Sequence, residues 1–226
     1  GIIHNLAGAA FPWDKGDGGP SICANLVYPQ SVEINQLDHI YIADGGVGRI
    51  RLIDATTGII STVVGTGIKG YTGDGSLATD ARVGSPTSIR FDIRGNLYFS
   101  DSMYNVVRMV NAETGIISTV VGSGKDGFSP DGTLALEASL KSPFGVEVSN
   151  EGTIYVSDTG NNRVRMVDST GMLRTVAGSD GGGDFGDGGP ATQAKLNSPY
   201  GLRLYAGNVL LICDMWNNRL RAVKLA

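Results

Sequence analysis

The sequence has few of the residues that build metal centres or membrane spans. Its 226 residues include two histidines, two cysteines and eight prolines, and 18% of them are charged. Two histidines in unrelated contexts cannot supply a three-histidine metal site. No apolar run approaches the roughly 18 residues of a membrane-spanning helix, so we expect no membrane insertion. The net charge is −4, and because Lys and Arg are scattered along the chain we expect no nucleic-acid partner.

Catalytic motifs are also missing. The sequence contains no Gly-x-Ser-x-Gly, Ser-x-x-Lys or phosphate-cradling Gly-Lys-Thr pattern. We therefore predict a protein that is not an enzyme and needs no cofactor. The two cysteines, Cys23 and Cys213, favour two free thiols, while a disulfide stays possible because sequence cannot place their Cα atoms within the required 7 Å or so.

The chain is rich in glycine, with 34 residues, and in short apolar runs. A similar segment begins at Pro29, Pro86, Pro143 and Pro199, at spacings of 57, 57 and 56 residues, and a fixed period of this size marks a repeat architecture. Each segment holds three runs rich in Val, Ile and Tyr, which are typical of strands. A fourth run follows at 59–65, 116–122 and 172–178, and residues 2–8 are its relative.

Four short strands per unit predict an all-β fold, a β-propeller of four four-stranded blades. We expect one domain, 1–226, with units of about 1–57, 58–114, 115–170 and 171–226. The unpaired fourth strand at residues 2–8 is the one that the last unit lacks, so we predict that the two pair and close the ring. The alternative is that these are four blades of a six-bladed ring.

Two segments carry a family resemblance. Residues 157–167 (SDTGNNRVRMV) and 213–223 (CDMWNNRLRAV) resemble NHL repeats, and the connectors 73–88 and 186–201 resemble the longer-linker NHL blades of teneurins and of bacterial and protist multi-repeat proteins. The resemblance covers all four units and implies an extracellular or cell-surface location. It leaves function open, because one fold hosts many sites: a binding scaffold, an architectural array within a larger protein, or a metal-dependent hydrolase or lyase with a channel-centred site.

Charged residues recur once per unit, and we interpret them as structural, since catalysis needs one asymmetric site rather than four copies. They are Asp44, Asp101, Asp158 and Asp214 at the end of each second strand, and Arg51, Arg108, Arg165 and Arg221 in each third strand. In the channel we expect Glu33 and Glu147 to be compensated by Arg90 and Arg203. Calcium is a weak candidate at Asp180, Asp184 and Asp187, whose spacing does not match an EF-hand loop.

Departures from the repeat indicate where a specific site lies. The loops between the second and third strands carry Met103 and Tyr104 in one unit and Met215 and Trp216 in another, on the face where we expect Trp13 of the first connector. Large aromatic and Met side chains dominate interface energetics, so we hypothesise that this face binds a protein or peptide. The alternative is that they pack beneath the connectors. Self-association, or packing against the rest of a larger chain, is a further expectation.

Overall fold

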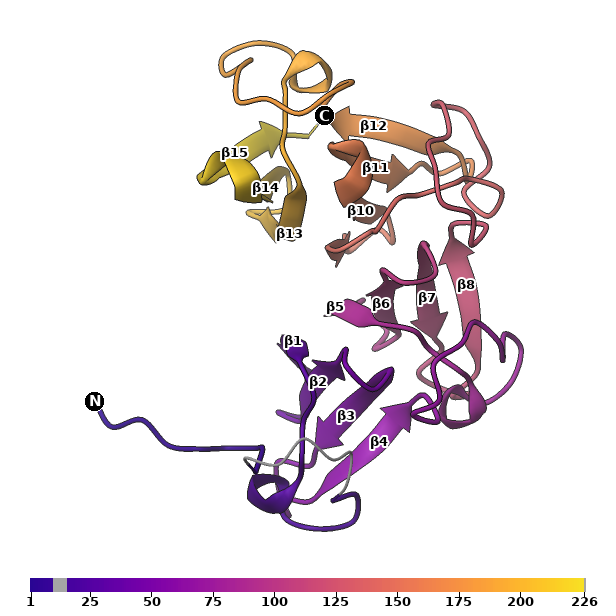
Figure 1. Ribbon diagram of the computed structural model, residues 1–226, viewed down its shortest axis with the longest axis vertical. Helices are drawn as coiled ribbons and strands as arrows, with labels where there is room; N and C mark the ends of the chain where they lie inside the picture. The colour runs from indigo at the N-terminus through magenta and orange to yellow at the C-terminus, as the bar shows by residue number, and fades with distance from the viewer. Residues whose placement is uncertain (10–15, 226) are drawn as a thin grey trace.

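The computed structural model describes residues 1–9 and 16–225 and is built from four antiparallel sheets that follow one another around an arc (Figure 1). Each sheet is a blade whose first strand lies innermost, and the three-residue 3-10 turns η1 to η5 are the only helical segments in these ranges. The all-β propeller prediction is therefore confirmed. Both cysteines are free thiols, as expected.

The strands of the first two blades have the following bounds. Blade 1 contains β1 (Pro29–Ile34), β2 (Ile40–Asp44), β3 (Arg49–Ile53) and β4 (Ile60–Val64). Blade 2 contains β5 (Pro86–Phe91), β6 (Leu97–Asp101), β7 (Val106–Val110) and β8 (Ile117–Val121).

Blades 3 and 4 continue the same order, but the fourth sheet has three strands. Blade 3 contains β9 (Val146–Val148), β10 (Ile154–Asp158), β11 (Arg163–Val167) and β12 (Leu173–Ala177). Blade 4 contains β13 (Pro199–Tyr205), β14 (Val209–Asp214) and β15 (Arg219–Lys224). The 3-10 turns are η1 (Ser21–Cys23), η2 (Ala78–Asp80), η3 (Thr159–Asn161), η4 (Ala191–Gln193) and η5 (Met215–Asn217).

The hydrophobic core lies between neighbouring blades. The face of a blade that looks toward the next one in the chain is called here its forward face, and the opposite side its back face. The forward face of blade 1 packs Ala43, Ile50 and Val64 against Ile89 and Phe99 on the back face of blade 2. The interfaces between blades 2 and 3 and between blades 3 and 4 repeat this arrangement at equivalent positions. Each blade is thus half of an apolar sandwich, and its stability depends on its neighbours.

The connectors fasten the outer edge of each blade to the next one. In the second connector a Cβ added to Gly73, which has a φ of +97°, would lie 2.7 Å from the Cα of Ala81. The first and fourth connectors show the same close approach at Gly16 and Gly186. Only glycine combines this backbone conformation with so little space, which explains why the sequence repeats a glycine and an alanine there.

The predicted ring closure is wrong for this structure. Residues 2–8 form no strand, and β15 pairs only with β14 among the described residues. The backbone N–H groups of Gly8 and Ala9 bind the carbonyls of Ser21 and Ala24, which holds the end of this segment beside blade 1. Blade 4 lies across the opening of the arc from that anchor, so the N-terminal segment does not reach it (Figure 1).

Candidate functional site

The loops between the second and third strands of each blade form one rim of the arc, called here the loop face. Each loop has four residues and ends in a left-handed residue, which is Gly48, Asn105, Asn162 or Asn218, with φ between +53° and +63°. Glycine and asparagine are the residues that adopt this conformation at least cost. At the second position of the loop, blades 1 and 3 have glycine, whereas blades 2 and 4 have a large residue.

Trp216 and Met103 occupy that second position, and both are exposed, Trp216 by 66% and Met103 by 48%. Tyr104 is half-buried instead: its ring stacks on Tyr71 of the second connector at 5.8 Å between centroids. The packing alternative thus describes Tyr104, while Trp216 and Met103 face solvent. Trp13 lies outside the described residues.

Met215 holds a different position from Trp216, although the two are neighbours in sequence. In blade 3 the equivalent residue, Thr159, is buried and donates a hydrogen bond from its Oγ1 to the carbonyl of Pro199 in blade 4. The first loop residue therefore points toward the following blade. Met215 is 47% exposed because the described chain has no blade there.

The arginines of the third strands are buried and reach outward to the connectors. Arg51 binds Asp17, and Arg108 binds Asp74, each through Nε and Nη2 to one carboxylate oxygen. The two arginine side chains are fully buried, and the two aspartate side chains are about 40% exposed. Hydrogen bonds and the charge of the arginine outweigh partial burial, so the pKa values of Asp17 and Asp74 lie below the ordinary range.

This ion pair was not predicted from the sequence. A signal was present, because the aspartate precedes its arginine by 34 residues in each of the first three pairs. The fourth pair, Asp187 with Arg221, has the same separation and an N–O distance of 2.7 Å. Two charged residues that recur at a constant distance within a repeat predict a contact between them.

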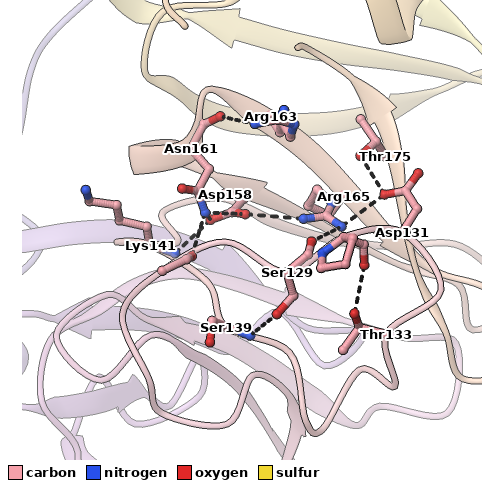
Figure 2. A network of polar contacts seen from close by, with 12 residues as sticks. Ser129, Asp131, Thr133, Ser139, Lys141, Asp158, Asn161, Arg163, Arg165 and Thr175 are labelled. Carbon is pink, nitrogen blue, oxygen red and sulfur yellow. Dashed lines mark hydrogen bonds and ion pairs between the residues drawn. The ribbon is translucent and has the colours of Figure 1, made fainter. Parts of the chain in front are cut away.

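The aspartates at the ends of the second strands accept backbone hydrogen bonds from the connectors. Asp158 accepts from the N–H of Lys141 and from the amide of Asn161, and it lies 3.6 Å from Arg165 (Figure 2). Burial raises the pKa of Asp158 to about 6, and it also raises the pKa of Asp101. Their carboxylates fix the connector to the hairpin, which is a structural task.

Blade 3 satisfies its buried arginine less completely than blades 1 and 2 do. The Nη2 of Arg165 donates to the carbonyl of Ser129 and to Asp131, whereas its buried Nε and Nη1 have no hydrogen-bond partner (Figure 2). The guanidinium lies 5.3 Å from the ring of Phe128. Burial lowers the pKa of Arg165, and the aromatic face supplies part of the missing stabilisation.

The calcium candidates are bound to basic side chains rather than to one another. Asp180 pairs with Arg163, Asp184 with Arg219, and Asp187 with Arg219 and Arg221. Within the described ranges no three acidic, His or Cys side chains converge as metal ligands. This geometry does not favour calcium, because the arginines neutralise the carboxylates that a cation would need.

The innermost strands meet in a cluster of four charges at the axis. Arg90 of β5 lies 2.7 Å from Glu33 of β1 and 3.2 Å from Glu147 of β9. Arg203 of β13 lies 3.7 Å from Glu33 and 4.0 Å from Glu147. The expected charge compensation is confirmed. Glu147 also accepts hydrogen bonds from the backbone N–H groups of Val148 and Leu204, so both oxygens of its carboxylate are hydrogen-bonded.

Comparison with known proteins gives relatives along the whole chain. Residues 125–184 match the model of the teneurin NHL domain. Mouse teneurin-4 is 31% identical over 254 residues, an alignment that covers 99% of this chain and 9% of teneurin-4. The chain thus spans less than a tenth of the teneurins it matches.

Solved structures share the fold at low sequence identity. An auxiliary nutrient-binding protein from Bacteroides ovatus has a TM-score of 0.64 at 20% identity, over 88% of this chain and 48% of its own. Virginiamycin B lyase from Staphylococcus aureus has a TM-score of 0.55 at 14% identity, over 87% of this chain and 52% of its own. At these identities the likeness concerns the fold alone. No helix in the described ranges has the length and hydropathy that a membrane span requires.

Proposed function

The chain belongs to the NHL-repeat β-propeller family, and we propose that it acts as a non-enzymatic scaffold that binds a protein or peptide through its loop face. The observation that carries this proposal is the exposure of Trp216, at a loop position where blades 1 and 3 have glycine. A solvent-facing indole supplies a large rigid contact surface, and such residues dominate binding energies. Met103 repeats the feature two blades away on the same rim.

The axial cluster supports a binding role over the enzymatic alternative. A channel-centred hydrolase or lyase would need carboxylates available to a metal or a substrate at the axis. Here Arg90 lies between Glu33 and Glu147 and donates hydrogen bonds to both. A ligand entering this channel would first have to break those charge-assisted bonds.

An architectural role within a longer polypeptide is the second candidate, and a specific observation favours it. At the two ends of the arc, the back face of blade 1 and the forward face of blade 4 expose apolar side chains that are buried at equivalent positions in the other blades. We also propose an extracellular or cell-surface location, which rests on the likeness to teneurins. Protease treatment of intact cells that produce the tagged natural protein tests this: a tag protected from the protease contradicts it.

The loop-face proposal is tested by panning a phage-displayed linear peptide library against the purified chain. Peptides that occupy the loop face should bind Trp216→Ala about 30-fold more weakly, the effect of losing about 2 kcal/mol at an interface hot spot. Met103→Ala should weaken the peptides that extend across blade 2. Ile93→Ala is the matched control, because Ile93 is also largely exposed but lies in the β5–β6 turn, at the opposite end of the blade.

Folding of each variant is checked by circular dichroism before binding is measured. Trp216 and Met103 are exposed and belong to none of the hydrophobic core clusters, so both variants should melt at the same temperature as the unmodified chain. Selected peptides that bind Trp216→Ala and Met103→Ala as tightly as the unmodified chain would contradict the proposal. A library that yields no binder blocked by either substitution would contradict it equally.

A further inference from the structure

A groove lies between blades 1 and 2 at the end of the blades opposite the loop face. It consists of two adjoining hollows of about 260 and 370 Å³, which share Tyr41, Phe91, Gly95 and Ala112 in their walls. The rings of Tyr41 and Phe91 meet edge to face at 4.7 Å between centroids. Both blades have all four strands, so the groove is framed on both sides. Cavities of this size with aromatic walls are typical of sites for small molecules.

The hollow beside the second connector, called here the outer hollow, is lined by apolar side chains. Leu97 and Val110 contribute from blade 2, Val63 from blade 1 and Leu77 from the connector. Leu97 is buried, whereas Leu77 is 53% exposed at the rim. None of the described residues in this lining is charged. An alkyl or aryl group inserted here would be transferred from water to a hydrocarbon environment, which is a large source of affinity.

The second hollow, called here the turn hollow, lies between the β1–β2 and β5–β6 turns. Leu37 and Ile93 are largely exposed at its rim. Asp92 and Arg94 are the charged residues in the described part of its lining. The groove as a whole therefore has a charged end in the turn hollow and an apolar end in the outer hollow.

Of these two charged residues, Asp92 is engaged within its own turn and Arg94 is available. Oδ1 of Asp92 accepts the backbone N–H groups of Arg94 and Asn96, and Oδ2 accepts a hydrogen bond from the side-chain amide of Asn96. Arg94 is exposed, and its guanidinium forms no ion pair with a residue in the described ranges 1–9 and 16–225. This end of the groove thus offers a free cation to an anionic ligand group.

These features belong to this junction and not to the repeat. Where the β5–β6 turn of blade 2 has Ile93 and Arg94, the equivalent β9–β10 turn of blade 3 has Asn150 and Glu151. The next junction therefore places a polar residue and the opposite charge at these positions. Packing of the blades does not require this difference, because the cores of the two junctions are equivalent. A site for one ligand does require it.

We propose that the groove binds a small amphiphile with a carboxylate head and an unbranched apolar body, the chemistry of a medium-chain fatty acid. The carboxylate pairs with Arg94 in the turn hollow. The apolar body passes over Tyr41 and Phe91 and enters the outer hollow. The groove lies at the opposite end of the blades from Trp216, so this inference is independent of the proposed loop-face binding.

Octanoate and octanol are suitable probes, because they share an alkyl chain and differ in the head group. Each is titrated into the isotope-labelled chain, and binding is followed through the backbone amide NMR signals. The signals of Gly95 and Ala112 should shift and saturate with octanoate. Those of Gly152 and Ser169, which hold the equivalent positions in blade 3, should not shift. The ratio of the octanoate and octanol affinities then measures the contribution of the charge.

Two substitutions test the two ends of the groove. Arg94→Gln should weaken octanoate binding about fivefold and leave octanol binding unchanged, which is the effect of losing one exposed ion pair. Ala112→Phe places a ring where the two hollows meet and should prevent both probes from shifting the Gly95 signal. Ala112→Ser is its matched control, since blade 3 has Ser169 there, and should bind both probes normally. Ala112 is exposed, so both Ala112 variants should fold, which circular dichroism checks.

Several outcomes would overturn the proposal. They are an octanoate to octanol affinity ratio that Arg94→Gln leaves unchanged, octanoate shifts at Gly152 as large as those at Gly95, and no saturable shift at Gly95. Concentration-dependent broadening of the Gly95 and Ala112 signals without a probe would also overturn it, because a second copy would then be the occupant. A library peptide that shifts these two signals where octanoate does not would make a protein the occupant and would overturn it as well.

Discussion

The interface between blades 3 and 4 and the forward face of blade 4 use the same repeat positions in opposite surroundings. Val164 is completely buried in the first, and Leu220 is two-thirds exposed in the second. Both positions carry apolar residues of the kind found in a core, because each repeat supplies side chains that pack against the neighbouring blade. A residue's contribution to stability in this chain is therefore set by its neighbour, and equivalent substitutions in the two regions measure that dependence.

The largest contrast is expected when a charge is introduced. Val164→Asp places a carboxylate in a dry interface and should lower the free energy of unfolding by more than about 4 kcal/mol, enough to unfold a marginal domain. Leu220→Asp puts the same charge in water and should cost less than about 1 kcal/mol. Urea unfolding followed by circular dichroism measures both. Similar losses in the two variants would mean that the forward face of blade 4 is covered in solution.

Removal of buried volume should give the next largest contrast. Ile89→Ala leaves a cavity between blades 1 and 2 and should cost about 3 kcal/mol. Val32→Ala removes a smaller, largely exposed side chain at the equivalent position and should cost less than about 1 kcal/mol. Because Ile loses one more carbon than Val, Val146→Ala at the equivalent, completely buried position of blade 3 is the size-matched control, with an expected loss of about 2 kcal/mol. A Val32→Ala loss as large as that of Ile89→Ala would contradict an open back face.

The strand pattern of the blades could be predicted because it depends on the local sequence. Residues such as Tyr98 and Tyr155 fall in alternating runs at a fixed period, and the turns end in Gly48 or in asparagine, so strand positions follow from spacing alone. Ring closure could not be predicted this way. The segment 2–8 has the sequence of a fourth strand and is anchored as one, yet its pairing depends on the curvature accumulated over four blades.

Contacts between residues far apart in the sequence could be predicted only where a repeated spacing indicates them. Tyr104 and Trp216 are both large residues in equivalent loops, so the sequence predicts that both are exposed binding residues, but Tyr71 in the neighbouring connector gives Tyr104 a stacking partner. No local pattern reports that contact. The pairs of Arg51 and Arg108 with connector aspartates, by contrast, were recoverable, since their separation of 34 residues is constant.

The pH dependence of stability sharpens the comparison by isolating a buried carboxylate. The folded pKa of Asp158 is about 6, above its unfolded value of 3.8. The folded state then binds more protons than the unfolded state between these values, so the stability due to neutral Asp158 is complete below pH 4 and is lost as pH rises through 6. Over this window the unmodified chain should lose about 1 kcal/mol per pH unit relative to Asp158→Asn.

Asp168→Asn controls for the loss of any carboxylate. Hydrogen bonds from Thr170 and Arg174 hold the pKa of Asp168 far below the ordinary range, so its stabilising effect is present above pH 4 and disappears only under more acidic conditions. The Asp168→Asn variant should keep the slope of the unmodified chain between pH 4 and 6. If Asp158→Asn kept it too, burial would not be what raises the pKa of Asp158.

The smallest contrast concerns a single hydrogen bond between blades. Asn162→Gly keeps a residue suited to the left-handed backbone but removes the Oδ1 acceptor that binds the N–H of Ser198 at 2.8 Å. Its loss should cost about 1 kcal/mol, because that N–H loses a partner at a half-buried junction. Asn218→Gly makes the same change at an exposed loop end and should be neutral within about 0.3 kcal/mol. Urea unfolding of the two variants measures this difference. Because the two substitutions are identical and both backbones are left-handed, the difference in cost reports the hydrogen bond between Asn162 and Ser198, and equal costs for the two variants would show that this bond does not stabilise the junction between blades 3 and 4.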